Sequence, residues 1–279
     1  MMKISRATFY YKPKESLKLI SDVELRSQIE KIHFVLPGYG YRRIYQHLLK
    51  REDLRVNSKR LRRIMRTYAL YSCIKKWMKP RGTNTSLDLR YPNLIKGLKL
   101  NAPNQVWATD ITYIKLHRQF IYLSAVIDIY TRKIVGWSLS KTLDHKFCLE
   151  SMKIAIKKEN PPPGIIHHSD RGVQYVCEDY VKFLLESGFK LSMSAVGTPE
   201  ENAFIESFFK TLKKEEIYFK NYQTLEDVLK NLPNFIEEVY NKKRMHSSLG
   251  YRSPQEFECD IKKLKIEDRP AQKIWGRTV

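Results

Sequence analysis

The chain has 279 residues, of which 42% are hydrophobic and 12% aromatic, so it can bury one full core with a smaller attachment and is no disordered tail. Its formal net charge of +21 predicts a polyanionic partner, with nucleic acid favoured over an acidic membrane surface. No apolar run reaches the roughly 18 residues of a membrane helix, and the first residues lack the apolar core of a signal peptide, so we expect a cytoplasmic protein without membrane contact.

Three short helices are predicted in the first quarter of the chain, over residues 22–36, 41–51 and 59–70. Each range carries apolar residues at helical spacing among many charges. Pro37 and Gly38 end the first helix. Suitable N-terminal caps are Ser21 or Asp22 for the first helix and Asn57 or Ser58 for the third.

Positive charge is concentrated in this helical region. Residues 41–81 hold fourteen Lys and Arg against two acids, whereas residues 101–200 hold twelve against ten. Basic side chains along a helix are typical of a recognition helix that follows a duplex groove or phosphate path. A solvated basic face is the competing interpretation, and the charge surplus favours the DNA contact. The candidate DNA-binding residues of this region are Arg42, Arg43, Lys59, Arg60, Arg62, Arg63 and Arg66.

A segment rich in Pro, Gly, Ser, Thr and Asn, residues 79–97, predicts a linker. Beyond it, β-branched and aromatic residues separated by short polar turns predict three consecutive antiparallel strands. The predicted elements are strands 105–116, 119–130 and 133–140, helix 145–159, strand 164–168, helix 178–188, strand 189–196 and helix 199–216. The order βββαβαβα indicates an α/β fold with a mixed five-stranded sheet covered by helices.

Three acids stand at unusual places in these elements. Asp110 interrupts a strand, where a half-buried charge is costly unless something satisfies it. Asp170 follows the fourth strand, a position where open α/β sheets gather ligands. Glu206 borders the apolar stripe of helix 199–216 on a helical wheel, so the packed helix would aim it at the sheet edge. Three converging carboxylates indicate a site for hard divalent cations, Mg²⁺ or Mn²⁺, and two such ions would suit in-line phosphoryl transfer.

Each acid also has a structural interpretation. Asp110 would be a buried structural acid, and Asp170 a turn acid paired with Arg171. The spacing of the three acids favours the metal site. The adjacent His167 and His168 have no Cys or His partner at ligand spacing. We expect at least one of them to be structural and His168 to be the one near DNA. The four cysteines are too far apart for a zinc knuckle or a disulfide framework, and we expect reduced, mostly buried thiols.

A resemblance to a known family is carried by the segments WATDITYI (107–114), HHSDRGVQY (167–175), ENAFIESFFKTLKKE (201–215) and YNKKRMHSSLGYRSPQEF (240–257). They resemble transposases of the DDE class, which have a ribonuclease H-like core of the retroviral-integrase type. More narrowly, the chain is similar to the second-reading-frame product (OrfB) of a bacterial insertion sequence. Fifty-nine residues separate Asp110 from Asp170, and thirty-five, the gap characteristic of the family, separate Asp170 from Glu206. Lys213 is the basic residue expected seven positions further on.

The N-terminal segments PGYGYRRIYQHL (37–48) and VNSKRLRRIMR (56–66) resemble the helix-turn-helix region that precedes such cores. The sequence departs from the patterns of related proteins in two respects. The HHCC zinc domain of retroviral integrases is absent from the sequence, and Glu201 stands where members of the group often have Asp. The implied division is a helix-turn-helix-like DNA-binding region at 1–78, a linker at 79–100, an integrase catalytic core at 101–220 and a helical extension at 221–279.

The resemblance implies a DNA transposase. Asp110, Asp170 and Glu206 would hold two Mg²⁺ or Mn²⁺ ions, so that water cuts a phosphodiester at the element's end and the freed 3′-hydroxyl is joined to target DNA. The implied partners are double-stranded DNA (the terminal inverted repeats and the target), further copies of the chain, and a first-reading-frame protein or fusion. The implied location is the bacterial nucleoid. Further DNA-contact candidates are Asn202, Lys210, Lys213, Arg244 and His246, with helix-end capping as the competing role for the last two.

Two other functions stay open from the residues alone. One is a structure-selective nuclease with the same three acids and no strand transfer. The other is a non-catalytic DNA-binding regulator of transposition.

Overall fold

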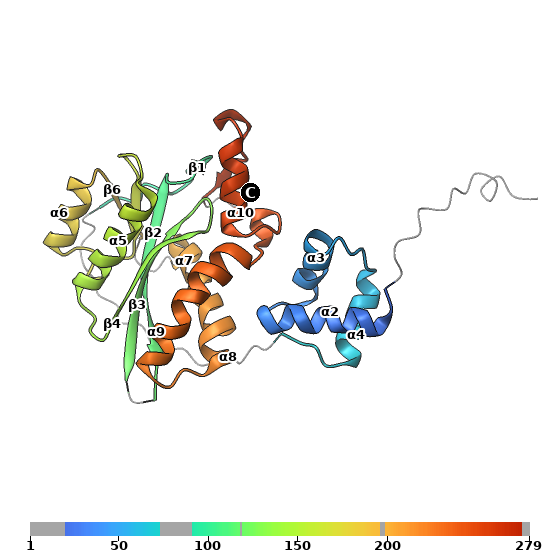
Figure 1. Cartoon of the computed structure of the whole chain (residues 1–279). Coiled ribbons are helices and arrows are strands. Elements are labelled where there is room, and N and C mark those ends of the chain that lie inside the picture. Colours follow the sequence, from blue (N-terminus) through green and yellow to red (C-terminus); the bar gives the residue numbers. More distant parts are fainter. Residues whose placement is uncertain (1–19, 73–90, 118, 196–198, 275–279) are drawn as a thin grey trace, which may run out of the picture. The chain divides into compact units, whose positions relative to one another are not determined.

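A computed structural model describes residues 20–72, 91–117, 119–195 and 199–274. The chain divides into two compact units, residues 1–72 and residues 73–279, which are described separately (Figure 1). Most of the predicted linker, residues 79–90, lies outside the described residues. Among the helices that the structure describes, none is long and apolar enough to cross a membrane.

The first unit holds the three predicted helices, α2 (Asp22–Val35), α3 (Tyr41–Arg51) and α4 (Ser58–Thr67). The side chain of Ser21 and that of Glu24 form a capping box at the start of α2, and Asn57 caps α4. The third helix ends three residues earlier than predicted. The apolar faces of the helices supply a small core of Leu25, Ile29, Ile44, Leu48, Leu61 and Ile64.

The second unit is built on a five-stranded sheet. Its strands are β2 (Val106–Lys115), β3 (Phe120–Asp128), β4 (Ile134–Ser140), β5 (Ile166–Ser169) and β6 (Lys190–Met193). Their order across the sheet is β4-β3-β2-β5-β6. The first three strands pair antiparallel, while β5 runs parallel to both β2 and β6. This arrangement confirms the predicted mixed sheet and the order βββαβαβα, which is that of a ribonuclease H-like fold.

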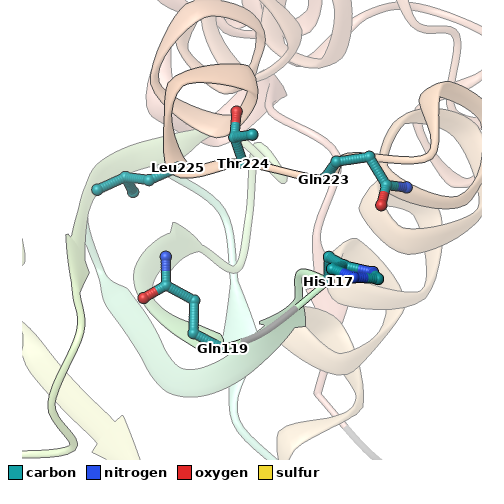
Figure 2. A pocket seen from close by; sticks show the side chains of 5 residues that line it. All are labelled: His117, Gln119, Gln223, Thr224 and Leu225. Atoms are coloured by element: carbon teal, nitrogen blue, oxygen red, sulfur yellow. The ribbon is translucent and has the colours of Figure 1, made fainter.

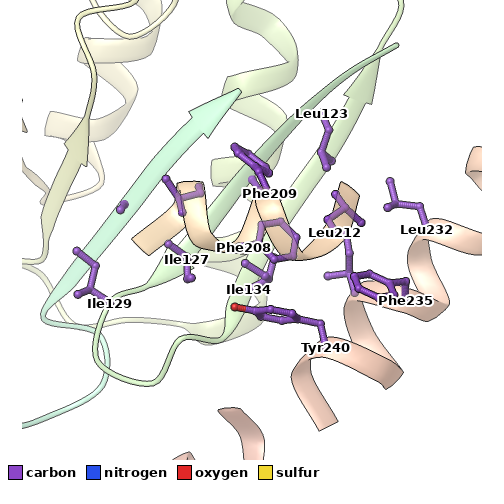
Figure 3. Close-up of a cluster of buried hydrophobic side chains, with 14 of the residues drawn as sticks. Leu123, Ile127, Ile129, Ile134, Phe208, Phe209, Leu212, Leu232, Phe235 and Tyr240 are labelled. Carbon is purple, nitrogen blue, oxygen red and sulfur yellow. The ribbon is translucent and has the colours of Figure 1, made fainter. Parts of the chain in front are cut away.

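Helices cover both faces of the sheet (Figure 1). On one face, α5 (His145–Glu159) and α6 (Glu178–Glu186) enclose a core that includes Trp107 and Tyr180. On the other, α7 (Ala203–Leu212) and α9 (Leu225–Asn234) complete a second core. Figure 3 shows Phe208 and Leu212 of α7 between the strands and the C-terminal helices. The packing of α7 on the sheet therefore fixes where its polar side chains point.

The predicted helix 199–216 and the first part of the predicted helical extension at 221–279 are less regular than expected. Helix 199–216 is observed as a 3₁₀ turn η1 (Pro199–Asn202), α7, a π-helix η2 (Lys213–Ile217) and the short α8 (Tyr218–Lys220). Helix α9 contains Pro233 and continues as a π-helix, η3 (Phe235–Lys243). A proline removes one hydrogen bond from a helix and crowds the preceding turn, and the wider turns begin shortly after it.

The chain ends in η4 (Ser247–Leu249), α10 (Pro254–Lys263), η5 (Ile266–Asp268) and β7 (Gln272–Lys273). A strand that the sequence did not predict, β1 (Lys99–Leu100), pairs antiparallel with β7. Ile95 and Leu100, within the predicted linker, are buried in the second unit. Of the described cysteines, Cys148 is buried, Cys177 half-buried and Cys259 exposed, so the expectation of mostly buried thiols is wrong for them.

Candidate active site

Asp110 lies in the middle of β2, paired with Ala125 of β3. Its Oδ1 accepts a hydrogen bond from the backbone N–H of Ile111 at 2.7 Å. Burial raises the pKa of Asp110 well above its usual value, and the negative charges of Asp170 and Glu206 raise it further. Three carboxylates from distant parts of the sequence are therefore electrostatic neighbours.

Asp170 follows β5 directly, because that strand ends at Ser169. Its Oδ1 accepts a hydrogen bond from the N–H of Gly172 at 2.9 Å. Burial raises the pKa of Asp170, although part of the residue stays exposed, and the Gly172 N–H opposes this shift. Arg171 donates to the carbonyl oxygen of Ser194 at 2.9 Å, which gives its guanidinium a role in holding β6 beside β5.

Glu206 lies on α7 beside the buried Ile205. Its side chain is 32% exposed, at the border of the apolar stripe, as the helical wheel predicted. Asn202 ties the start of α7 to the sheet, because its Nδ2 donates to the carbonyl oxygen of Thr109 at 3.3 Å. That contact joins α7 to the strand residue directly before Asp110. Two anchors, the apolar stripe and this amide, thus position Glu206.

The donor set of this site consists of carboxylate oxygens alone. Hard divalent cations take oxygen ligands, and a cation between several carboxylates offsets the repulsion that burial makes costly. Asp110, Asp170 and Glu206 come from the strand interior, the strand end and the helix that the sequence indicated. The residues present therefore fit a hard divalent cation.

Two lysines border the carboxylates. Lys210 Nζ lies 3.1 Å from Glu206 Oε2. Lys213 Nζ lies 4.3 Å from the centre of the Tyr113 ring, and its charge lowers the pKa of Asp110. Sequence reasoning singled out both lysines and missed Tyr113, which stands three residues after Asp110 on the same strand.

The two histidines before Asp170 are both buried. His167 Nε2 lies 3.1 Å from Thr109 Oγ1 and 2.9 Å from the Tyr180 hydroxyl. His168 is bonded to the hydroxyls of Ser192 and Ser194 of the β6 edge. Burial lowers the pKa of His167 to about 3 and that of His168 to about 4, so both rings are neutral at physiological pH. Both histidines support the strand that carries Asp170, and because the His168 ring is fully buried it is not open to direct contact with DNA.

Three further DNA-contact candidates have packing roles in this structure. Asn202 is 5% exposed and Arg244 is 4% exposed. Arg244 donates to both carboxylate oxygens of Glu215, at 2.8 and 2.9 Å. The His246 ring packs edge-on against Tyr240 with 5.0 Å between ring centres. These placements favour the closing of the core as the role of Asn202, Arg244 and His246.

The DNA-contact candidates of the first unit differ in their surroundings. Arg60 and Arg63 both bond to the carboxylate of Asp22, and Arg60 also donates to the carbonyl of Ile20. Arg62 stacks over the Tyr41 ring at 4.3 Å. Lys59 and Arg66 present exposed side chains to solvent, and the exposed Arg42 donates from its Nε to the Tyr41 hydroxyl at 3.1 Å. Arg43 is half-buried and lies over the Tyr39 ring at 5.6 Å.

An open pocket of about 530 Å³ lies elsewhere on the second unit. Figure 2 shows its lining side chains, His117 and Gln119 at the turn between β2 and β3, and Gln223, Thr224 and Leu225 where α9 begins. These lining residues include no carboxylate. They therefore lack the ligands of a hard-cation site, and the carboxylate cluster remains the candidate active site.

Three family models match the sequence. Two models described as "Integrase core domain" match residues 101–199 and 187–254. A model described as "HTH-like domain" matches residues 21–76. The matches follow the division of the structure into a small helical unit and a sheet-based unit.

Relatives of the chain come from bacterial insertion sequences. The transposase for insertion sequence element IS904 of Lactococcus lactis is 39% identical over 221 residues, 79% of this chain and 87% of that protein. A putative transposase InsK for element IS150 of Escherichia coli K12 is 33% identical over 257 residues, 91% of this chain and 90% of the relative.

Similar solved structures are retroviral. A simian T-cell lymphotropic virus intasome in complex with the PP2A regulatory subunit B56 gamma is 14% identical, with a TM-score of 0.47, covering 83% of this chain and 74% of that one. The HTLV-2 integrase catalytic core domain in complex with magnesium is 14% identical, with a TM-score of 0.44, covering 56% and 97%.

The integrase core and the transposase relatives together assign DNA transposition and integration to this chain. The corresponding class of enzyme is a polynucleotidyl transferase. The helix-turn-helix-like domain assigns it DNA binding. This chain belongs to the family of insertion-sequence transposases with an integrase core domain.

Proposed function

We propose that the chain is a DDE transposase whose catalytic and metal-binding residues are Asp110, Asp170 and Glu206. The observation that carries the proposal is that the charges of Asp170 and Glu206 both act on the buried Asp110 and, together with its burial, raise the pKa of Asp110. Such a cluster is costly unless a cation balances it.

The proposed ligand is Mg²⁺ or Mn²⁺, two ions per site. When bound, these ions supply Lewis-acid charge to the attacking and leaving oxygens of an in-line phosphoryl transfer. Because burial raises the pKa of Asp110 and Asp170, each must give up a proton before it can act as a ligand, so cation affinity increases with pH. Lys210 and Lys213, which border the carboxylates, would balance the charge of the DNA phosphates.

The substrates under this proposal are the terminal inverted repeats of the element and a target duplex. A first reaction hydrolyses a phosphodiester at the element's end, and a second joins the freed 3′-hydroxyl to target DNA. We propose residues 1–78 as the DNA-binding region, 101–220 as the catalytic core and 221–279 as a helical extension. We also propose that the chain acts as a homo-oligomer on DNA, with a first-reading-frame protein or fusion as a partner.

The test replaces Glu206 with Gln and measures cleavage of a labelled element end in Mg²⁺. Cleavage and joining should fall by a factor on the order of 10³ or more, because interactions with a metal-stabilised transition state are worth several kcal/mol. Binding to the same DNA should stay within about twofold, since one of many charges changes. Glu226→Gln, an exposed acid in the first turn of α9, is the matched control and should cut normally.

A pre-cut end with a free 3′-hydroxyl separates this proposal from a nuclease. The transposase should join that end to a target duplex, whereas a structure-selective nuclease should not. Retained cleavage in Glu206→Gln, or DNA binding without cleavage by the natural chain in both Mg²⁺ and Mn²⁺, would refute the catalytic assignment.

A further inference from the structure

Outside the carboxylate site, three side chains with metal-binding atoms meet where α5 and α6 begin. His145 is the first residue of α5, Cys177 immediately precedes α6, and Asp179 lies in the first turn of α6. One ligand atom from each lies within 4.8 Å of the other two. Figure 1 shows the two helices side by side on one face of the sheet.

The spacing of these atoms is near that of a zinc site. Zinc bonds of roughly 2.0 to 2.3 Å in a tetrahedron place ligand atoms about 3.3 to 3.7 Å apart. His145 Nε2 and Asp179 Oδ2 are already 3.6 Å apart. The atoms of the other two pairs, at most 4.8 Å apart, must approach by up to about 1.5 Å. The Asp179 side chain is 76% exposed, so it can rotate toward the other two without moving the core.

The kinds of ligand also select the metal. An imidazole nitrogen, a thiol sulfur and a carboxylate oxygen form the mixed set that Zn²⁺ accepts, whereas Mg²⁺ takes oxygen ligands. The cluster at His145 and the all-carboxylate site around Asp110 therefore differ in chemical hardness. The chain would then bind different metal ions at the two sites, because the sites offer different ligand atoms.

The local structure leaves the sulfur available. Cys177 occupies the N-cap position of α6, where Ser, Thr, Asp or Asn usually accepts a hydrogen bond from the helix. Its side chain makes no such capping bond. It is half-buried, so an ion can reach it from solvent. The partial positive charge at the two helix starts opposes a cation, and the deprotonated Cys177 and Asp179 of the bound state would offset it.

We propose that His145, Cys177 and Asp179 bind Zn²⁺, with water as the fourth ligand. The ion would clamp the starts of α5 and α6 together. It would also fix the far end of the segment 170–177, whose near end carries Asp170. The zinc site is a structural one, independent of the chemistry proposed for the carboxylates.

The experiment uses the full chain with Asp110→Asn, Asp170→Asn and Glu206→Gln, so that the carboxylate site takes no metal. Metal-free protein is titrated with Co²⁺ and then with Zn²⁺. The expected results are a thiolate-to-cobalt charge-transfer absorption band, its loss as Zn²⁺ displaces Co²⁺, and one tightly bound zinc per chain by elemental analysis.

Cys177→Ser in this background should abolish the cobalt band and lower zinc affinity, while Cys259→Ser, an exposed cysteine on α10, should change neither. His145→Gln keeps the thiol and should also lose the tight zinc, which covers the case in which Cys177→Ser does not fold. No cobalt–thiolate band in the parent chain, or undiminished zinc binding in both variants, would overturn the proposal.

Discussion

Gly172 determines how closely the chain can turn after Asp170. A Cβ atom at this position would lie 3.0 Å from Asp170 Oδ1 and 3.0 Å from Gln174 Oε1. At Gly136 of β4 a Cβ would lie 2.3 Å from the carbonyl oxygen of Ser151, and the backbone would have to shift to relieve this clash. At Gly40 nothing lies within 4 Å. The three glycines thus form a graded series of steric demand.

Replacing Gly172 with Ala should push Asp170 by a few tenths of an ångström. Active-site groups tolerate little displacement, so cleavage of an element end should fall about tenfold. The melting temperature should change little, because Gly172 is half-buried and lies outside the helices and strands. Gly40→Ala is the control with normal cleavage, and Gly136→Ala should lower the melting temperature strongly. Normal cleavage by Gly172→Ala would mean that Asp170 does not need its observed position.

Single residues also show where sequence reasoning stops. Asp110, Asp170 and Glu206 can be proposed from the sequence because each is unusual in its own element. The partners of the basic residues were not, since Arg60 bonds to Asp22 across 38 positions and Arg244 to Glu215 across 29. A count of charge along a helix cannot tell a paired guanidinium from an exposed one.

At the scale of elements, a buried ion cluster joins three of them. Lys133, just before β4, lies 2.8 Å from a carboxylate oxygen of Glu159 at the end of α5 and 2.8 Å from one of Glu258 in α10. All three side chains are largely buried, at 16%, 8% and 6% exposure. The cluster connects the helix on one face of the sheet with the C-terminal helix.

Lys133→Met should destabilise the second unit by about 3 to 5 kcal/mol, because it removes the cation beside the buried Glu159 and leaves the buried Glu258 with the exposed Lys262 alone. Lys158→Met is the matched control. It breaks the half-exposed pair with Glu237 and should cost less than about 1 kcal/mol. Urea unfolding at neutral pH measures both. Equal losses in the two variants would show that burial does not matter here.

The same cluster predicts a pH dependence. Burial raises the pKa of Glu258, but hydrogen bonds from Lys133 and Lys262 outweigh it and hold that pKa below its usual 4.5. A lowered folded-state pKa stabilises the fold above the unfolded value and loses this contribution as the pH falls. The difference in unfolding free energy between the natural chain and Lys133→Met should therefore shrink below about pH 4.5.

The elements that the sequence predicted are those with a clear period. Strands β2, β3 and β4 and helix α5 begin and end within two residues of the predicted limits. The pair β1 and β7 was missed because two-residue strands carry no periodicity. The π-helices η2 and η3 were missed because apolar periodicity in a sequence does not separate a π-helix from an α-helix.

At the scale of the whole molecule, the net charge of +21 predicts salt-dependent DNA binding. Lys59 is exposed on α4, whereas Arg60 beside it is bonded to Asp22. Lys59→Gln should reduce the slope of log affinity against log salt concentration by about one. It should weaken binding to all DNA sequences by the same factor. Fluorescence anisotropy over a range of salt concentrations measures the slope.

Arg60→Gln is the contrasting variant. It removes bonds to both Asp22 and Ile20, so the main loss should be in the melting temperature of the first unit. A larger change of salt slope in Arg60→Gln than in Lys59→Gln would contradict the assignment of Lys59 to DNA contact and of Arg60 to stabilising the fold.

Helix α7 follows β6, the last strand of the five-stranded sheet, and this order has a consequence during synthesis. Ninety-five residues separate Asp110 from Glu206 in translation order, and their synthesis takes roughly 5 to 20 seconds at ordinary elongation rates. Under the proposed function, a ribosome-bound chain can show its DNA-binding helices and two of its acids while it lacks the third. Premature termination before α7 would release a protein that occupies DNA without cutting it.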